Sequence, residues 1–517
     1  MNLDEFLYKL HYESDKITPP DWEVNWEDAP LPYKLYRDLP AVELDSDIPQ
    51  VLEQTAKPML KEISHFLWYS FGLTQVSESF PFPGDTNSWT TCRRFVPSGG
   101  GLYPNELYLY LKIEDAADGI YHYDVAHHRL VCLREGNFDD YLDRALGSRC
   151  DISSIFGAVF ISTFFWKNFF KYHNFSYRLQ GLDAGFVMGQ LLEVGRRLGF
   201  ETGVYYHFLD HAINHLIGIN DCEESVYAVV PLSVDKKMSW FRDKASAPLS
   251  AKNLCVELEP LHHQHYIRSK EIIDYPMLLK MNEACMMDSF TVAPKKMRLK
   301  SEKRNKPAIP LTKVERLSYD FSSACRKRYS PGLDFVLKPI TELTLSSLLT
   351  ETSAVRSYRN DLDRDGEHLS SRVSLYVSTY QIDGLPNGLY VYNDSKHSLI
   401  PLAEGDYRTA LQDGILSDFV NTAQIPLSLT FVGDQDHYKH AYGYRGHRIQ
   451  HMEAGVLSHS LNLAASASNL GAHPILGFHV PWYDELFHLK QSAKTSLLHL
   501  PIGYYRPNGR LQGSLRV

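Results

Sequence analysis

Two stretches decide the fold: YHNFSYRLQGLDAG at residues 172–185 and YGYRGHRIQHMEAG at residues 442–455. They align without a gap at an offset of 270 residues (442 minus 172), with Asp183 on Glu453 and Ala-Gly on Ala-Gly. Solenoid repeats have units of about 20–50 residues, so a period this long indicates a duplicated domain. We therefore expect two copies of one fold in the chain.

The same register holds elsewhere in the chain. DGIYHY (118–123) aligns with NGLYVY (387–392) at an offset of 269 (387 minus 118). In each copy a short apolar run typical of a buried strand, Val159–Phe165 or Leu427–Val432, precedes a long helical pattern. These features predict an α+β fold duplicated in tandem.

The two predicted helices carry small residues on one face. Gly185 and Gly189 lie in the first helix, and Gly455 and the Ala464-Ala465 pair lie in the second. The pattern fits two helices that are each buried in their own copy. It also fits two helices that pack the halves against each other, because small side chains let backbones approach closely.

Composition and charge narrow the class of protein. A chain of 517 residues exceeds the roughly 250–300 residues that one core supports. With 53 Lys+Arg against 62 Asp+Glu the net charge is −9, so we expect neither nucleic acid nor a membrane as partner. The longest apolar run, 157–166, is half of what spans a bilayer. Acidic residues stand where an export signal would be basic, which predicts a cytoplasmic protein.

We predict four segments: an N-terminal arm (1–60), a first half (61–235), a linker (236–315) and a second half (316–517). The basic run 291–308 in the linker is interpreted as an exposed connector. Seven scattered cysteines without a CxxC spacing indicate neither a disulfide framework nor a zinc site.

The densest unusual motif is CRRFVPSGGGLYPNELYLYLK at 92–112. Pro97 and three glycines in residues 97–101, which we call the lid loop, leave a backbone on which a flat ligand can lie. A tight surface loop that enters a strand would have the same composition. The motif is neither a Walker loop nor a GxGxxG turn.

Other polar clusters are candidate sites. Basic side chains that could grip a phosphate, or form solvated patches, are Arg326, Lys327, Arg328, Arg356, Arg359, Arg506 and Arg510. Lys171 and Tyr172 form an adjacent pair that could transfer protons if burial or a neighbouring cation shifts their pKa values. The segment LHHQHY (261–266) has no i, i+4 histidine spacing, so we predict no metal site.

Together these motifs resemble the flavin-dependent nitroreductase superfamily and, within it, the SagB/ThcOx-type azoline dehydrogenases, which make thiazoles and oxazoles in peptide natural products. FLWYSFGLTQ (66–75), RRFVPSGGGLYPNELY (93–108), DGIYHY (118–123) and KYHNFSYRLQGLDAG (171–185) occur in the family's order. The likeness covers about residues 30–232, and the second half repeats it more loosely.

The resemblance implies an FMN enzyme. In this superfamily each flavin lies at a dimer interface, held by one subunit and covered by the Pro-Ser loop of the other, so this chain would be an intramolecular pseudo-dimer that could pair further into a homodimer. The implied catalytic residues are Lys171 and Tyr172. The implied cofactor-binding residues are Arg94, Pro97, Ser98, Gly99, Gly100, Arg326, Lys327, Arg328, Leu476, Gly477, Arg506 and Arg510.

The copies differ in a way that predicts one FMN per chain. The Pro-Ser-Gly-Gly motif has no counterpart in the second half, where RNDLDRDGEHLSS (359–371) occupies the region. The basic cluster is strong only in the second half, and Lys171 aligns with Ala441. The phosphate and ring would then be held by the second half and covered by the first.

The resemblance also implies the reaction. A thiazoline or oxazoline carried on a peptide, presented by a carrier protein or peptide synthetase, would lose a hydride to FMN and a proton to a base, and O2 would reoxidise the flavin. We expect Tyr172 to be the base, with its pKa lowered by Lys171. An NAD(P)H-dependent nitroreductase or quinone reductase, and a non-catalytic docking protein with a flavin pocket, remain alternatives.

Overall fold

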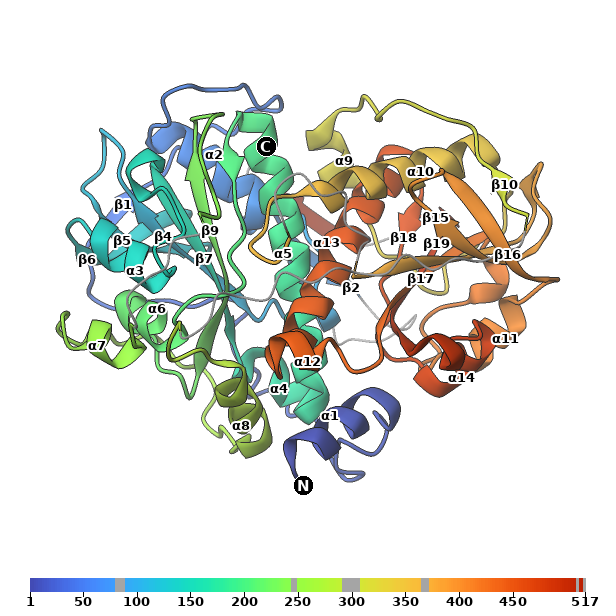
Figure 1. Cartoon of the computed structure of the whole chain (residues 1–517), viewed down its shortest axis with the longest axis horizontal. Helices are drawn as coiled ribbons and strands as arrows, with labels where there is room; N and C mark the ends of the chain where they lie inside the picture. The colour runs from blue at the N-terminus through green and yellow to red at the C-terminus, as the bar shows by residue number, and fades with distance from the viewer. Residues whose placement is uncertain (80–88, 243–248, 291–306, 364–371, 508–510, 515–517) are drawn as a thin grey trace.

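The computed structural model describes residues 1–79, 89–242, 249–290, 307–363, 372–507 and 511–514. Two antiparallel sheets with the same strand order form its two halves (Figure 1). The order β6-β5-β4-β7-β9 in the first sheet corresponds to β16-β15-β13-β17-β19 in the second. Val159 pairs with Val230 in the first and Leu429 with Leu500 in the second, so the ladders repeat at the offset of 270. The predicted tandem duplication is confirmed.

The first sheet and its helices have the following bounds. The strands are β1 (Ala41–Glu43), β4 (Asn105–Leu111), β5 (Gly119–Asp124), β6 (Arg129–Glu135), β7 (Gly157–Phe164), β8 (Glu201–Thr202) and β9 (Glu224–Ser233). The helices are α2 (Leu60–Phe71), α3 (Asp139–Ala145), α4 (Trp166–Tyr172), α5 (Ser176–Leu198) and α6 (Asp210–Ile217).

The second half repeats these elements. Its strands are β10 (Ile309–Pro310), β11 (Phe335–Val336), β13 (Ser374–Thr379), β15 (Gly388–Asn393), β16 (Ser398–Glu404), β17 (Leu427–Asp434), β18 (Gly471–Ala472) and β19 (Lys494–Tyr505), with β12 (Ile340–Thr341) and β14 (Ile382–Asp383) forming a separate pair. Its helices are α9 (Phe321–Lys327), α10 (Glu342–Ala354), α11 (Arg408–Asp413), α12 (Lys439–Tyr442), α13 (Arg445–Ala467) and α14 (Val480–Leu486).

Helices α5 and α13 lie side by side between the two sheets and join the halves (Figure 1). A methyl group on Gly185 would lie 2.1 Å from the Met452 carbonyl oxygen, and one on Gly455 would lie 2.5 Å from that of Leu182. Only hydrogen fits at this crossing. The small faces therefore do pack the halves against each other.

The hydrophobic cores are shared across this crossing. Leu182 and Phe186 of α5 belong to the core of the second half. Met452 and Val456 of α13 belong to the core of the first half. Each long helix thus supplies apolar side chains to the opposite sheet.

Both chain ends also cross between the halves. Helix α1 (Leu3–Tyr12) packs against α14, and His11 bonds the Thr495 hydroxyl at 2.7 Å. At the other end, β20 (Leu511–Ser514) pairs with β2 (Gln75–Ser79), which pairs with β3 (Trp89–Arg93). A strand from the second half therefore completes a small sheet beside the lid loop.

The apolar run 157–166 forms buried strand β7 and the start of α4, as its length predicts. In the described part of the chain, no helix has the length and apolarity to cross a membrane. The segment between the halves contains α7 (Ala251–Cys255) and α8 (Pro276–Cys285). Most of the predicted basic connector, 291–308, lies outside the described residues.

Candidate functional site

The lid loop is fastened to helix α5. The Ser98 hydroxyl donates to an Asp183 carboxylate oxygen at 2.6 Å, and the Gly99 N–H donates to the same carboxylate at 3.2 and 3.3 Å. Ser98 Oγ also accepts the Tyr103 N–H at 2.9 Å. One acidic side chain therefore holds the start of the loop, and one serine holds its end.

The loop lies directly on the predicted proton-transfer pair. Gly100 has a left-handed φ of 64°, and a methyl group at this position would lie 2.6 Å from Tyr172 Oη and 2.8 Å from Lys171 Nζ. Only glycine satisfies both the backbone angle and the contact. The structure thus brings the two motifs together.

Lys171 and Tyr172 end helix α4, and the N-terminal arm covers them. Trp22 Nε1 donates to the Lys171 carbonyl at 3.3 Å, and Lys171 Nζ lies 5.2 Å from the centroid of the Trp26 ring. The two indoles shield the pair from one side. Both arm residues were missed by the sequence analysis, because nothing in the sequence shows where the arm folds back.

The electrostatics of the pair differ from expectation. Burial lowers the pKa of Lys171. Burial, with a smaller contribution from the Asp183 charge, raises the pKa of Tyr172. The prediction that Lys171 lowers the pKa of Tyr172 is therefore wrong. Desolvation disfavours both charged forms, so the lysine is the group that more readily takes up a proton from a substrate.

In the second half, the loop after β18 presents two backbone amides. In the described structure, neither the Leu476 nor the Gly477 N–H donates to any acceptor. A methyl group on Gly477 would meet no atom within 4 Å. The Leu416 N–H donates to the Gly477 carbonyl at 2.9 Å and holds the loop from behind. This loop offers donors and open space to a planar ligand.

The equivalent position in the first half is closed. Tyr206 and His207 stand where Leu476 and Gly477 stand, at the offset of 270, and their side chains are buried. Their N–H groups donate to Asp361 at 2.9 and 3.0 Å, and Asp361 pairs with Arg149 at 3.0 Å. Both amides are already satisfied there.

The basic cluster of the second half lies against the first half. Arg328 is buried, and its Nε donates to the Phe95 carbonyl at 2.6 Å. Arg93 donates to the Arg328 carbonyl at 2.7 Å. Arg326 and Lys327, at the end of α9, are exposed. The cluster thus adjoins the strand that leads into the lid loop.

A chain of contacts joins this cluster to the open loop. Pro331 packs against Gly471, and its carbonyl bonds His473 Nδ1 at 2.5 Å. Leu476 belongs to the same apolar cluster as Leu179, which touches Gly99 of the lid loop. The lid loop therefore contacts the core of the second half, to which Leu476 also belongs.

Three further residues predicted to bind the cofactor are Arg94, Arg506 and Arg510. Arg94 is buried in the first half, where it donates to the Pro32 carbonyl at 2.6 Å and stacks 3.7 Å from the Phe71 centroid. Its Nε and Nη1 atoms are buried and have no hydrogen-bond partner in the described residues. The Arg506 N–H donates to the Asp334 carbonyl at 2.9 Å, which places exposed Arg506 near the cluster. Arg510 lies outside the described residues.

The site residues fit an FMN. Exposed Arg326, Lys327 and Arg506 suit a phosphate, and the unpaired amides of Leu476 and Gly477 suit the polar edge of a flat ring. Asp183 was missed as a site residue. Its alignment with Glu453 was visible in the sequence, but its contact with the lid loop was not.

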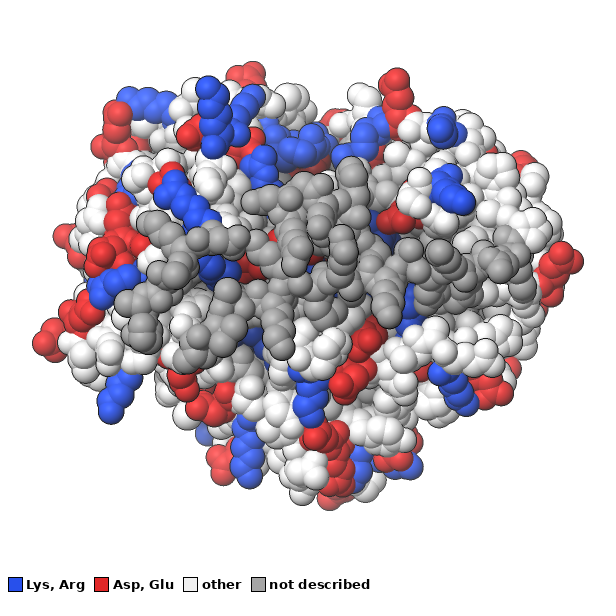
Figure 2. All heavy atoms as spheres, viewed as in Figure 1, with Lys and Arg blue, Asp and Glu red and all other residues white. Residues whose placement is uncertain are grey.

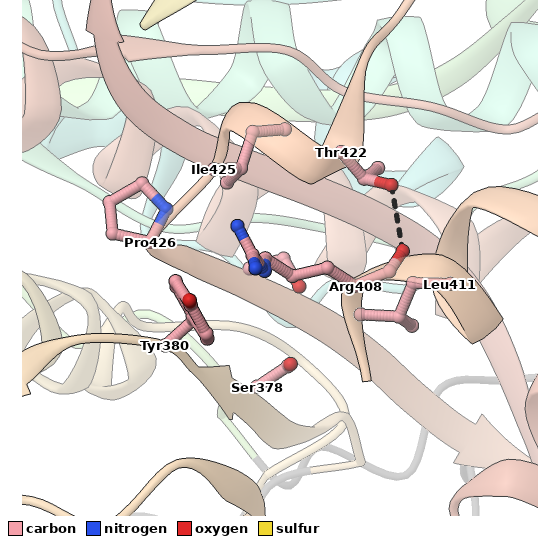
Figure 3. Close-up of a pocket in the computed structure, with 8 residues that line it drawn as sticks. Ser378, Tyr380, Arg408, Leu411, Thr422, Ile425 and Pro426 are labelled. Carbon is pink, nitrogen blue, oxygen red and sulfur yellow. Dashed lines mark hydrogen bonds between the residues drawn. The ribbon is translucent and has the colours of Figure 1, made fainter. Parts of the chain in front are cut away.

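Two other concave regions lie outside this site. The pocket in Figure 3 has a volume of about 10 Å³, and Arg408 there lies over the Tyr380 ring and pairs with Asp406. It has room for a single water at most. A broader groove of about 720 Å³ is lined by His262, His263 and His265. No group of three metal-ligating side chains occurs in the described residues.

Surface charge gives no single-sign field on the face in Figure 2. Lys and Arg are interspersed there with Asp and Glu. This view therefore points to no polyanion-binding surface.

Comparison with known proteins identifies the fold. No family model matches the chain. The crystal structure of a nitroreductase-like protein from Anabaena variabilis matches 98% of this chain and 99% of its own, with a TM-score of 0.76 and 22% identity. The protein therefore has a nitroreductase-like fold, present here in two fused copies.

Two sequence relatives add to this result. A nitroreductase-like protein of Methanocaldococcus jannaschii is 24% identical over 170 residues, which cover 33% of this chain and 84% of that protein. The trifolitoxin-processing protein TfxB of Rhizobium leguminosarum bv. trifolii is 28% identical over 145 residues, 26% of this chain and 37% of that protein. Fold and sequence together confirm the predicted resemblance to the nitroreductase superfamily.

Proposed function

We propose that the protein is an FMN-dependent dehydrogenase that oxidises thiazoline or oxazoline rings in peptides to thiazoles or oxazoles. The observation that carries the proposal is the meeting of the lid loop with Lys171 and Tyr172. The Leu476 and Gly477 N–H groups, which have no acceptor in the described part of the chain, support it. The similarity to a trifolitoxin-processing protein supports a peptide substrate. We expect the substrate to be presented by a carrier protein or peptide synthetase.

We further propose a single flavin site per chain, built from both halves. Gly477 leaves the second-half position open, whereas His207, Tyr206, Asp361 and Arg149 fill the equivalent first-half position. Exposed cations near the open position would neutralise one phosphate. The closed position has no corresponding free amides, because Asp361 accepts both.

The chain's own residues define the mechanism. FMN, when bound, would supply the acceptor for the hydride that leaves the azoline ring, with O2 as the final oxidant. The Leu476 and Gly477 amides would hold the ring, and Arg326, Lys327 and Arg506 would hold the phosphate. Neutral Lys171 takes the proton from the azoline carbon, since burial favours its uncharged form. Tyr172 keeps its proton and orients the substrate, while the lid loop and Trp22 exclude water.

The proposal can be tested on a single preparation of the purified protein. Its visible spectrum should show bound flavin, and the amount of flavin should correspond to one FMN per chain. Mass spectrometry should then show a loss of two hydrogens from a model thiazoline peptide under air. Two FMN per chain would overturn the single-site proposal. Rapid bleaching by NAD(P)H without azoline oxidation would favour a nitroreductase or quinone reductase, and a colourless protein that binds no FMN would favour a docking role.

A further inference from the structure

Asp183 is a buried carboxylate without a cationic partner. Its side chain is 3% exposed, and in the described residues it forms no ion pair with a lysine, arginine or histidine, because the groups that hydrogen-bond to it are Ser98 and Gly99. Its recorded hydrogen-bond donors, the Ser98 hydroxyl and the Gly99 N–H, both come from the lid loop. An isolated buried anion is costly unless its hydrogen bonds compensate. The free-energy cost of burying the Asp183 carboxyl group without a cation indicates that this side chain has a role beyond packing.

The equivalent residue in the other half has a different role. Glu453 forms a buried ion pair with Arg372 at 2.8 Å and accepts from Tyr358 at 3.4 Å. An acid at this helix position is therefore neutralised by a cation in the second half. In the first half the loop's own donors take the place of that cation.

We propose that Asp183 is a positioning residue that latches the lid loop onto Lys171 and Tyr172. The latch has three links: the carboxylate holds Ser98 and Gly99, Ser98 holds Tyr103, and Gly100 between them is pressed against the pair. The catalytic consequence rests on the proposed function. The latch itself does not, because it is a property of the chain's own contacts.

Burial raises the pKa of Asp183 to about 7, so above that pH the residue is a carboxylate. The Ser98 hydroxyl donates to this carboxylate, and Ser98 Oγ accepts the Tyr103 N–H. Gly99 brings a second donor to the same carboxylate. A carboxylate is acceptor-only, whereas an asparagine offers one acceptor and an NH2 group. Asp183→Asn would set that NH2 against one of the two donors and release one end of the loop.

The latch is measured at pH 8, where Asp183 is a carboxylate, by hydrogen exchange with mass spectrometry on the full chain, with and without added FMN. In Asp183→Asn we expect the amides of Gly99 and Tyr103 to exchange at least tenfold faster, while the middle of α5 exchanges as in the parent. The matched control is Glu453→Gln, which removes the corresponding charge from the second half and should leave the lid loop unchanged. Equal exchange of the lid loop in parent and Asp183→Asn would overturn the proposal.

A second variant covers the case in which Asp183→Asn does not fold. Ser98→Ala removes only the hydroxyl from the loop and should also speed Tyr103 exchange, and unchanged exchange there would contradict the latch. If the protein oxidises azolines, Asp183→Asn should lower kcat about tenfold with FMN content and KM near parent values, because position rather than binding is lost. A KM change alone would contradict positioning. If no azoline is oxidised, the proposed function fails and the exchange result still decides the latch.

Discussion

At the scale of single residues, Gly477 and His207 occupy the same place in the two copies and give it opposite properties. One leaves two amides and open space, and the other lies in a closed network with Asp361 and Arg149. A fused pair of domains can lose one of two equivalent sites without losing its fold, because the scaffold depends on other residues.

Gly477→His should therefore close the remaining site. The glycine has no left-handed φ and no neighbour in the way, so the imidazole can be accommodated without loss of stability. We expect FMN affinity to fall more than tenfold and the melting temperature to stay within about 2 °C of the parent. Equilibrium dialysis with FMN and a thermal melt without it check both.

His207→Gly is the matched control. Asp361 still accepts the two amides and Arg149 still covers them, so the bound FMN should remain at one per chain. Full FMN binding by Gly477→His would contradict the assigned ring site.

The pKa directions at Lys171 and Tyr172 give a second prediction. Lys171→Met keeps the length of the side chain and removes the proton acceptor, so kcat should fall about 10²- to 10⁴-fold, the usual range for a lost general base. Tyr172→Phe should cost less, about tenfold, because burial keeps the tyrosine protonated. Both variants should retain FMN.

The pH dependence of kcat separates the two roles. Activity that needs neutral Lys171 falls as the pH drops below the pKa of that amine, which burial places below its usual value. This acid limb should persist in Tyr172→Phe and be absent from the residual activity of Lys171→Met. A larger loss in Tyr172→Phe than in Lys171→Met would return the base to the tyrosine.

At the level of residues, the sequence predicted which motifs belong to the candidate site, but it did not predict the burial and contacts of their side chains. The resemblance named Lys171, Tyr172 and the lid loop, and the structure brings these together. The pKa of Tyr172 depends on burial and on Asp183, which approaches only after the chain folds. The resemblance implied Arg94 as a flavin-binding residue, but the burial of its side chain against Phe71 could not be predicted from the sequence.

At the scale of elements, the α5–α13 crossing is the joint on which the pseudo-dimer depends. Its basis was visible in the sequence as small residues at Gly185 and Gly455, and strands such as β7 were visible as apolar runs. The contacts of α1 and β20 with the opposite half could not be predicted from the sequence. Pairing of a short tail with a distant strand leaves no periodic signal.

A methyl group at the α5–α13 crossing should lower the stability of the protein. In Gly185→Ala the added carbon meets the Met452 backbone, which cannot rotate away, so we expect the free energy of unfolding to fall by about 1–3 kcal/mol, as for overpacked cores. Urea unfolding followed by circular dichroism measures this change.

Gly195→Ala on the same helix is the control. Its added carbon would lie 3.5 Å from Thr202 Cγ2, an ordinary contact, so the better helix propensity of alanine should leave stability unchanged or raise it by up to about 1 kcal/mol. Similar losses in both variants would show that the close approach of the helices is not the cause.

At the scale of the whole molecule, a buried histidine cluster ties the N-terminal helix to the second half. His11, His437, His447 and His451 lie ring to ring, with centroids 5.2, 4.7 and 4.2 Å apart along the series. Burial is the largest cause that lowers the pKa of each, and it lowers that of His437 to about 4. Arg178 adds a positive charge that opposes protonation of all four.

This cluster contributes to how stability depends on pH. Unfolded histidines bind protons below about pH 6.5, whereas the folded cluster does not, so the unfolded state holds more protons and stability falls as the pH drops from 6.5 towards 4. For His437 alone the loss approaches about 3 kcal/mol at the lower end. Burial raises the pKa of Asp183 to about 7, which gives the opposite slope between its unfolded pKa near 4 and 7. Burial also lowers the pKa values of His459 and His499 to about 3, so these two residues add to the loss of stability in acid.

His447→Leu tests this account, because neither ring nitrogen of His447 has a hydrogen-bond partner in the described structure. Replacing a buried, unpaired polar ring with an apolar side chain of similar size removes one proton-binding site from the unfolded chain without breaking a bond. The free energy of unfolding, measured in urea from pH 8 to pH 5, should fall less steeply with acid than in the parent. His262→Leu, at an exposed position, should keep the parent slope, and a slope unchanged in His447→Leu would place the acid sensitivity outside the cluster.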